Sequence, residues 1–369
     1  MNRLFRSVAL ASLLLVGVAA DSHHSFAVFD QSQSVEIRGV IVAFNFRNPH
    51  SSFVIDGIAF LDGVPLGTGT ERWEIESDTT AALSTKGIGA DSFKAGDRIT
   101  LHAAPSREEG LRFGHATSLT RADGTDFQFG FGGTSRAYSP SVQQAFGMPP
   151  DVKTAATVAN PAPTSIAGRW QQPVTPSGTE SALPLNARGV AARAAFDPKH
   201  SPANTCEPMS FPDVFNAPFF LIDIAVTPSE AVIRHEIYDI ERHIPLDGSW
   251  AAADPDGWFG QVRGQLEDGA LVIESRGYPV SGWGLGIATH VLGGGADVPS
   301  SEQKAVTERY SVSADGQTLT IEYTLTDPVY LSAAYSASVD LTRVPPGTQM
   351  YPYACDLEAA AMWSRTVGD

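Results

Sequence analysis

The sequence contains few cysteines and none of the short motifs that mark the common enzyme classes. Only Cys206 and Cys355 occur, far apart and without the CxxC spacing of zinc or thiol redox sites. There is no phosphate loop, dinucleotide fingerprint, HExxH helix or serine-nucleophile motif. These absences argue against phosphoryl transfer, hydride transfer, zinc proteolysis and covalent hydrolysis. They leave cofactor-free acid–base chemistry, by a lyase or an isomerase, or ligand binding without catalysis.

Basic residues are scarce relative to acidic ones. The chain has 25 Lys and Arg against 41 Asp and Glu, which gives a formal net charge of −16. Such acidity repels phosphate backbones and anionic membrane surfaces. We therefore expect a small-molecule ligand rather than a nucleic acid as the partner.

Long apolar runs are absent beyond the first residues of the chain. Two arginines precede an apolar run that ends in the small residues Val18, Ala19 and Ala20, a pattern typical of a secretory signal peptide. The run is too short to span a bilayer. We predict a signal peptide over residues 1–20 and a periplasmic or secreted mature protein that begins at Asp21 and has no membrane span.

The two cysteines suit that location. In an oxidising compartment, an even pair far apart in the sequence predicts one disulfide between Cys206 and Cys355. By the loop-entropy relation such a bridge contributes roughly 4–5 kcal/mol. A metal or redox role is the weaker alternative, because two cysteines with this separation make a poor site.

Residues 21–130 have the pattern of a small β-barrel. The runs VEIRGVIVAFNFRNPHSSFVIDG and ERWEIES are β-rich, TAALSTKGI is helix-like, and DRITLHAA and RFGHATSLT are β-rich again. Three strands, a helix and two strands is the order of an OB-type barrel. We therefore predict an OB-like barrel over this part of the chain.

The composition changes after this barrel. Residues 131–165 are rich in Pro, Ala, Ser and Thr, which predicts a linker. From Ile166, β-rich runs are separated by the turn signals LDG, EDG and ADG, as expected for antiparallel hairpins. Residues 166–369 are therefore predicted to form a lipocalin-like antiparallel barrel, which makes the fold all-β. Gly168-Arg169-Trp170 is similar to the GxW opening of lipocalins.

Several stretches resemble families that have no assigned activity. HHSFAVFD, RNPHSSF and GDRITL resemble an exported bacterial family of unknown function. AAFDPKHSPANTCEP, RHIPLDG, DGALVIESRGY and YPYACD are similar to a second domain of unknown function that often accompanies it. In the first family the histidine pair lies at the mature terminus, whereas Asp21 and Ser22 precede it here. This departure argues against His23 or His24 as the terminal residue that binds a ligand. Neither family has a known activity, so the resemblance implies no reaction and no ligand.

The predicted mature terminus could bind a metal. Asp21, Ser22 and His23 place a histidine third, so that the amine, two deprotonated amides and the imidazole could surround Cu(II) or Ni(II) in a plane. A cluster of His23, His24 and His50 is a second arrangement that could hold such an ion. The structural alternative is that these histidines only lead into the first strands and pack beside them.

The strand period of two places polar residues inside the second barrel. By this alternation His235, Arg242 and Glu308 all point inward. One account is a structural Arg242–Glu308 ion pair with His235 beside it, because buried charge is costly unless paired. The functional account is a pocket in which Glu308 or His235 moves a proton while Arg242 holds an anion. The residues assigned to ligand contacts are Tyr238, His243, Trp283, His290 and Tyr310.

Two further expectations concern the surface. The Gly-rich segment Gly277–Gln303 is predicted to be a long connection that covers the pocket, the alternative being a mobile surface loop. Glu236 and Glu322 fall on polar strand faces and are expected in solvent, although Glu236 could face the pocket if a bulge near Tyr238 shifts the register.

Three functions from different classes remain. The favoured one is binding of a small, partly apolar ligand in the second barrel, with cofactor-free acid–base catalysis as an extension. The second is a periplasmic Cu(II)- or Ni(II)-binding protein that uses the mature terminus. The third is a non-catalytic interaction module, because OB barrels commonly bind partners.

Overall fold

The structure is a computed structural model that describes residues 28–130, 165–171, 183–217, 220–252, 258–287, 297–345, 347–358 and 360–361. The predicted signal peptide, the predicted metal ligands Asp21, His23 and His24, almost all of the predicted linker, and His290 lie outside these residues. Within the described ranges, no helix is both long and apolar enough to cross a membrane.

Five strands close the N-terminal barrel. Pairing runs from β1 to β2, β4, β6 and β5, and β5 pairs back onto β1. β4 and β6 are parallel, and a short helix lies between β4 and β5. This is the predicted OB-like barrel. The elements are β1 (Val35–Asn45), β2 (Ser52–Leu61), β3 (Val64–Pro65), β4 (Glu71–Glu76), α1 (Thr80–Thr85), β5 (Arg98–Pro105), β6 (Phe113–Arg121) and β7 (Asp126–Gln128).

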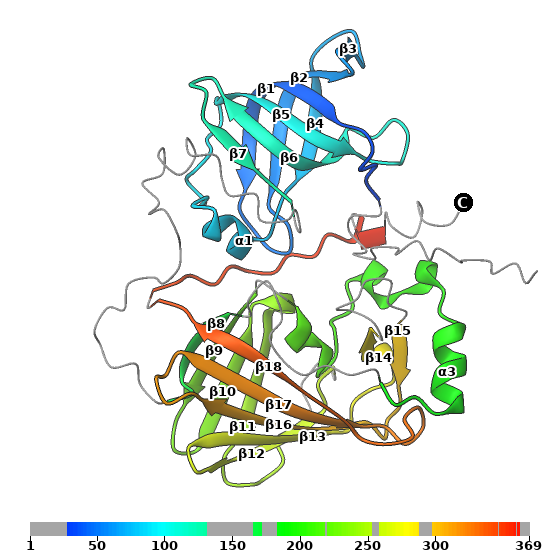
Figure 1. The fold of residues 1–369 in the computed structure, drawn as a ribbon, viewed down its shortest axis with the longest axis vertical. Coiled ribbons are helices and arrows are strands. Elements are labelled where there is room, and N and C mark those ends of the chain that lie inside the picture. Colours follow the sequence, from blue (N-terminus) through cyan, green and yellow to red (C-terminus); the bar gives the residue numbers. More distant parts are fainter. Residues whose placement is uncertain are drawn as a thin grey trace, which may run out of the picture.

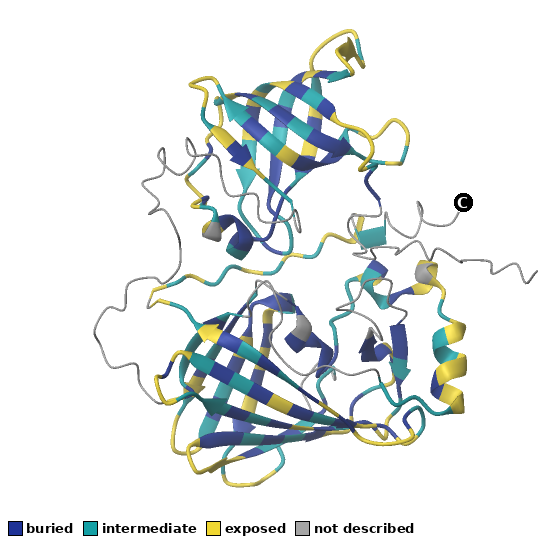
Figure 2. Cartoon of the chain, in the orientation of Figure 1, coloured by how far each residue is buried: buried dark blue, intermediate teal, exposed yellow. Residues whose placement is uncertain are grey.

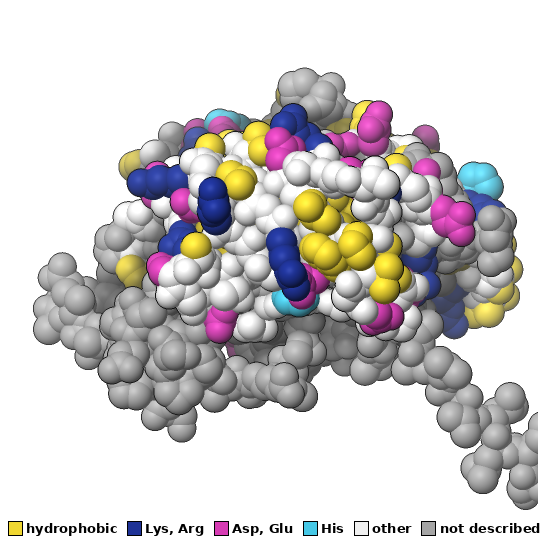
Figure 3. All heavy atoms as spheres, turned by 90° about the horizontal axis from the view of Figure 1, so that it is seen from above, with side chains coloured by type: hydrophobic (Ala, Val, Ile, Leu, Met, Phe, Trp, Pro, Cys, Tyr) yellow, Lys and Arg dark blue, Asp and Glu magenta, His cyan; other side chains and the backbone are white. Residues whose placement is uncertain are grey.

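Strand alternation fills this barrel and leaves its outside mixed in character. Val35 and Ile37 of β1 are buried, while Arg38, which follows them, is exposed. Figure 2 shows the same alternation along the strands of both barrels. On the outer side, Val42 and Ile58 remain partly exposed. Seen from this end of the molecule, apolar side chains gather among acidic and basic ones (Figure 3).

Nine antiparallel strands form the C-terminal barrel, in the order β11-β10-β9-β8-β18-β17-β16-β13-β12 (Figure 1). The two ends of this order meet closely, because a Cβ added at Gly264 of β12 would lie 2.5 Å from Ile244 of β11. The predicted antiparallel barrel is therefore confirmed and nearly closed. Its strands are β8 (Gly168–Gln171), β9 (Leu221–Val226), β10 (Glu230–His235), β11 (Ile240–Pro245), β12 (Gln261–Glu267), β13 (Ala270–Arg276), β16 (Ala305–Val312), β17 (Thr318–Thr326) and β18 (Tyr335–Arg343).

In the second barrel, an arginine stacks on a tryptophan where β8 pairs with β18. The Arg343 guanidinium lies 4.0 Å above the Trp170 ring, and it donates to the carbonyl oxygens of Ser165, Ala167 and Gly316 at 2.7–3.0 Å. Trp170 belongs to the GxW stretch and is fully buried. In the registers of β8 on β9 and of β9 on β10, Trp170 and His235 both lie opposite Ile222.

The barrel interior around His235 is covered by the chain before β9. Phe211 and Phe215 insert their rings into it, 5.3 Å from the His235 ring and 5.8 Å from the Tyr323 ring respectively. We call residues 206–217 the cap. The short helices of this region are α3 (Ala187–Ala194), η1 (Pro198–His200), η2 (Pro202–Thr205) and η3 (Asp213–Asn216).

The segment Gly277–Gln303 is not one long connection, so that prediction was wrong. It contains β14 (Ser281–Ile287) and β15 (Asp297–Ser300), which pair with each other. In SGWGLGI the glycines alternate with apolar residues, and Trp283 is buried. A Cβ at Gly284 would lie 1.8 Å from the Ser300 hydroxyl. The glycines therefore serve close packing along a strand, which is a period-two pattern that a Gly-rich composition conceals.

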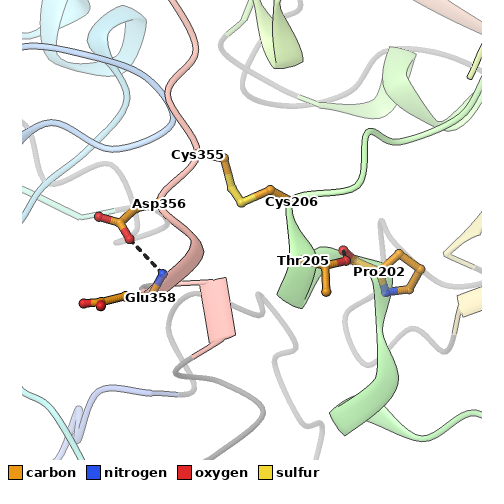
Figure 4. The surroundings of a disulfide bond; sticks show 6 residues. All are labelled: Pro202, Thr205, Cys206, Cys355, Asp356 and Glu358. Atoms are coloured by element: carbon orange, nitrogen blue, oxygen red, sulfur yellow. Dashed lines mark hydrogen bonds between the residues drawn. A yellow bond between two sulfur atoms is a disulfide. The ribbon is translucent and has the colours of Figure 1, made fainter. Parts of the chain in front are cut away.

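An extended segment, the strap (residues 347–358), runs between the two barrels (Figure 1). The predicted disulfide between Cys206 and Cys355 is present and joins the strap to the start of the cap (Figure 4). On the other side, the Ala354 amide donates to the Asn48 carbonyl oxygen at 2.8 Å. The strap thus connects the second barrel covalently, and the first by hydrogen bonds.

Candidate functional site

The centre of the second barrel holds a buried ion pair. Arg242 of β11 donates to both carboxylate oxygens of Glu308 of β16, each at 2.8 Å. The same guanidinium donates to Ser275 at 3.0 Å, and the Tyr310 hydroxyl donates to Glu308 at 2.7 Å. The Phe211 ring lies 4.0 Å from the Arg242 guanidinium carbon. Strand alternation predicted that these charges point inward, and both residues are indeed buried.

The electrostatics keep Arg242 charged. Burial opposes the charge on Arg242, but the charge and hydrogen bonds of Glu308 outweigh burial and raise the pKa of the guanidinium. Burial raises the pKa of Tyr310 well above its ordinary value, so its hydroxyl remains a donor. Glu308 accepts three hydrogen bonds from these two partners. This arrangement suits a structural ion pair better than a group that exchanges protons.

His235 is buried beside the pair without hydrogen bonds of its own. The residue is 2 % exposed, and neither ring nitrogen has a hydrogen-bond partner among the residues that the structure describes. Its nearest rings are Phe211 at 5.3 Å and Phe215 at 6.0 Å. Burial, and then the charge of Arg242, lowers the pKa of His235 to about 3. The imidazole is therefore neutral near pH 7.

A small cavity of about 10 Å³ borders His235. This volume is close to what a single water requires. His235 is the polar side chain of the lining, and the others are apolar. They are Val214, Phe215, Ala217, Phe220, Leu221, Ile222 and Ile237.

The remaining sequence candidates are dispersed. Tyr310 belongs to the ion-pair network, and Trp283 is buried on β14. Tyr238 is half-buried in the turn after β10, with its ring 4.7 Å from that of Tyr353. His243 is exposed on the outside of the barrel, where its ring nitrogens contact Glu230 and Glu241. Its alternation along β11 is opposite to that of Arg242, so His243 cannot line the interior.

Glu236 was expected in solvent, and that expectation was wrong. It is 1 % exposed, and its carboxylate accepts hydrogen bonds from the amides of Leu221 at 3.0 Å and Tyr351 at 2.7 Å. β10 ends at His235 and the chain turns into η4 (Ile237–Asp239), so the strand alternation stops one residue too early to apply. Glu322, in contrast, is exposed as expected.

Sequence reasoning also missed two buried groups near β14. Lys304 is 1 % exposed and donates to the Ser210 hydroxyl at 2.6 Å and to the Gly284 carbonyl oxygen. Burial lowers its pKa to about 7. Asp297 is 2 % exposed, and burial raises its pKa to about 6. Asp297 stands between Ala296 and Val298, and Lys304 two residues before Val306, but neither charged residue was predicted to be buried.

The predicted metal ligand that the structure does describe is His50, in the loop between β1 and β2. It is half-buried, and its Nδ1 has no hydrogen-bond partner in the described part of the chain. Glu76 and His115 lie near enough to interact electrostatically with His50. Among the described residues, no three His, Cys, Asp or Glu side chains are arranged to hold a metal ion.

Comparison with known proteins gives a family for the first part of the chain. Residues 10–115 match DUF6152, a family of unknown function. The match ends within β6 of the N-terminal barrel. No curated protein matches the chain.

The buried ion pair generates a stability prediction. Glu308→Gln leaves Arg242 buried with a neutral partner, so we expect a loss of about 3–5 kcal/mol in the free energy of unfolding, measured by urea denaturation. The control is Glu274→Gln, whose partner Arg263 lies 2.7 Å away on the exposed side of the same barrel; its loss should be under about 1 kcal/mol. Equal, small losses in both variants would contradict a structural role for Glu308.

Neutral His235 predicts sensitivity to acid. Its pKa is about 3 in the folded protein against 6.5 for the ordinary side chain, so the unfolded chain binds one more proton between these values. Stability from neutral His235 is complete above pH 6.5 and is lost as the pH falls toward 3, by about 1.4 kcal/mol per unit.

His235→Gln should therefore flatten the dependence of unfolding free energy on pH between 4 and 6, by about one proton. His243→Gln is the matched control, because hydrogen bonds to the carboxylates of Glu230 and Glu241 raise the pKa of His243 and give its contribution the opposite sign. Identical slopes for the wild type and His235→Gln would show that His235 is not buried in neutral form.

Proposed function

We propose that the C-terminal barrel binds a small, partly apolar ligand at the end that carries His235. The observation that carries this proposal is a fully buried imidazole that has no hydrogen-bond partner in the described structure and borders an otherwise apolar cavity. A buried polar group without a partner costs about 1–3 kcal/mol, so its presence calls for a ligand or water that satisfies it. A molecule with one polar group and an apolar body matches this lining.

The cavity also limits the proposal. Its volume of about 10 Å³ holds a water but not a ligand. Binding therefore requires that side chains of the cap, which supplies Val214 and Phe215, move aside. The cap is attached to the barrel by packing rather than by a strand ladder, so its movement leaves the nine-stranded sheet intact.

Catalysis would need other groups than those first considered. Neutral His235, with its pKa lowered to about 3, is a weak base. Lys304 and Asp297 have pKa values moved to about 7 and about 6, but neither lines the cavity beside His235. The proposal is accordingly binding.

The test uses cyclohexanol as the probe, followed by ligand-detected NMR. We expect saturable binding to the wild type and at least about tenfold weaker binding to His235→Phe, which removes both ring nitrogens. His243→Phe alters a histidine on the outside of the same barrel and should bind like the wild type. Absence of saturable binding, or equal weakening by both substitutions, would contradict the proposal.

A second candidate function is metal binding at the mature terminus. The observation that favours it is the anchoring of Phe29, which forms a β-bridge with Ser106 and lies 5.6 Å from the His115 ring. His50 lies near His115, so Phe29, five residues after His24 in the sequence, lies beside these histidines.

This candidate can be tested on protein that begins at Asp21. We expect one Cu(II) per chain with the visible absorption of a planar nitrogen site, and loss of that band when one alanine precedes Asp21. His50→Ala should leave the band unchanged. Equal copper binding by the native and extended forms would exclude the terminal site, and a loss in His50→Ala would indicate a histidine cluster instead.

A further inference from the structure

The Phe211 ring lies between two polar side chains of the second barrel's interior. It is fully buried, 4.0 Å from the Arg242 guanidinium carbon and 5.3 Å from the His235 ring. Three nitrogen atoms of these two neighbours, Arg242 Nε and both ring nitrogens of His235, are buried without a hydrogen-bond partner in the described part of the chain. An apolar ring thus contacts hydrogen-bonding groups that it cannot satisfy.

We infer that the Phe211 ring occupies the place of a ligand ring, and that the ligand is an uncharged, planar aromatic molecule with a hydroxyl group, such as a phenol. The inference rests on the proposed function and specifies the class of ligand. It assigns the Arg242 guanidinium as the stacking surface, and His235 with Arg242 Nε as the partners of the hydroxyl.

The planar ring follows from the contact that Phe211 already makes. A guanidinium stacks favourably on an aromatic face, and the contribution grows when water is excluded. When Phe211 leaves, Arg242 loses this contact, and only another planar ring restores it. A saturated ring of equal size would fill the volume without doing so.

The absence of charge on the ligand follows from the ion pair. Glu308 takes one hydrogen bond from each terminal nitrogen of Arg242, so the positive charge is already compensated and Nε alone remains. A ligand carboxylate would be buried next to Glu308 without a countercharge of its own, which is costly. A neutral oxygen that accepts from Nε avoids that cost.

The hydroxyl follows from the protonation state of His235. A neutral imidazole offers one N–H donor and one acceptor nitrogen, and the low pKa of His235 keeps it neutral. A phenolic hydroxyl can donate to the acceptor nitrogen of His235 while its oxygen accepts from Arg242 Nε. A hydrocarbon offers neither interaction.

Phe211 can leave because it belongs to the cap and not to the barrel. It lies between Cys206, which the disulfide fixes to the strap, and η3. The strands that carry His235 and Arg242 are paired to each other and do not depend on residues 206–217 for ladder hydrogen bonds. Displacement of the ring therefore exposes a site whose polar walls are already in position.

Four matched probes test each part of the inference with wild-type protein, by ligand-detected NMR at pH 7. p-Cresol is the expected ligand. Toluene lacks its hydroxyl, 4-methylcyclohexanol lacks its planar ring, and p-toluate carries a charge. We expect p-cresol to bind about tenfold tighter than toluene and about fivefold tighter than 4-methylcyclohexanol, with no measurable binding of p-toluate.

Two variants locate the site. Phe211→Ala vacates it, so p-cresol should bind about tenfold tighter than to the wild type while its preference over toluene is kept. Phe53→Ala removes a fully buried ring from the first barrel, and should leave the affinity for p-cresol within about threefold of the wild type.

The outcomes separate this inference from the function on which it rests. If the wild type binds 4-methylcyclohexanol or toluene as tightly as p-cresol, the barrel binds ligands but the assigned class is wrong. If Phe211→Ala gains no affinity, or Phe53→Ala gains as much, the ring does not occupy the ligand's place, and the inference is overturned. If the wild type binds none of the four probes, the proposed function itself fails.

Discussion

The buried Arg242–Glu308 pair is the constraint around which the second barrel is organised. Two opposite charges removed from water are tolerated only when their remaining hydrogen bonds are met. Tyr310 and Ser275 supply such bonds from neighbouring strands, and Phe211 covers the guanidinium face. These partners come from β11, β13, β16 and the cap. The pair therefore fixes the register of strands that lie far apart in the sequence, and it holds the cap against the barrel interior at Arg242.

A second buried carboxylate, that of Glu236, helps to join the two barrels without an ion pair among the described residues. Its oxygens accept hydrogen bonds from the backbone amides of Leu221, in the second barrel, and Tyr351, in the strap. Asn48 of the first barrel receives the Ala354 amide of the same strap. Backbone amides of the strap thus donate hydrogen bonds to both barrels. The disulfide at Cys355 holds the strap between the two barrels.

Much of this architecture was predictable, because it depends on local patterns. Strand order identified the OB-like barrel, and period two correctly placed His235 and Arg242 in the interior. The pattern failed where the chain leaves a strand: Glu236 follows the last residue of β10, and no residue type there indicates the turn. It failed again at Lys304 and Gly284, whose contact depends on pairing between distant segments. The partners of His235 could not be predicted, since hydrogen bonding is set by tertiary packing.

Two of the arginines of the second barrel that stack on aromatic rings differ in how their donors are satisfied, and this difference indicates where function lies. Arg343 covers Trp170, and its donors reach three carbonyl oxygens. Arg242 covers Phe211 but keeps an Nε that has no partner in the described structure, beside a histidine with two more such nitrogens. The fold therefore satisfies the donors of Arg343 with fixed backbone carbonyl groups. The unpartnered nitrogens lie beside Phe211, whose ring belongs to the cap, and there a ligand could replace that ring.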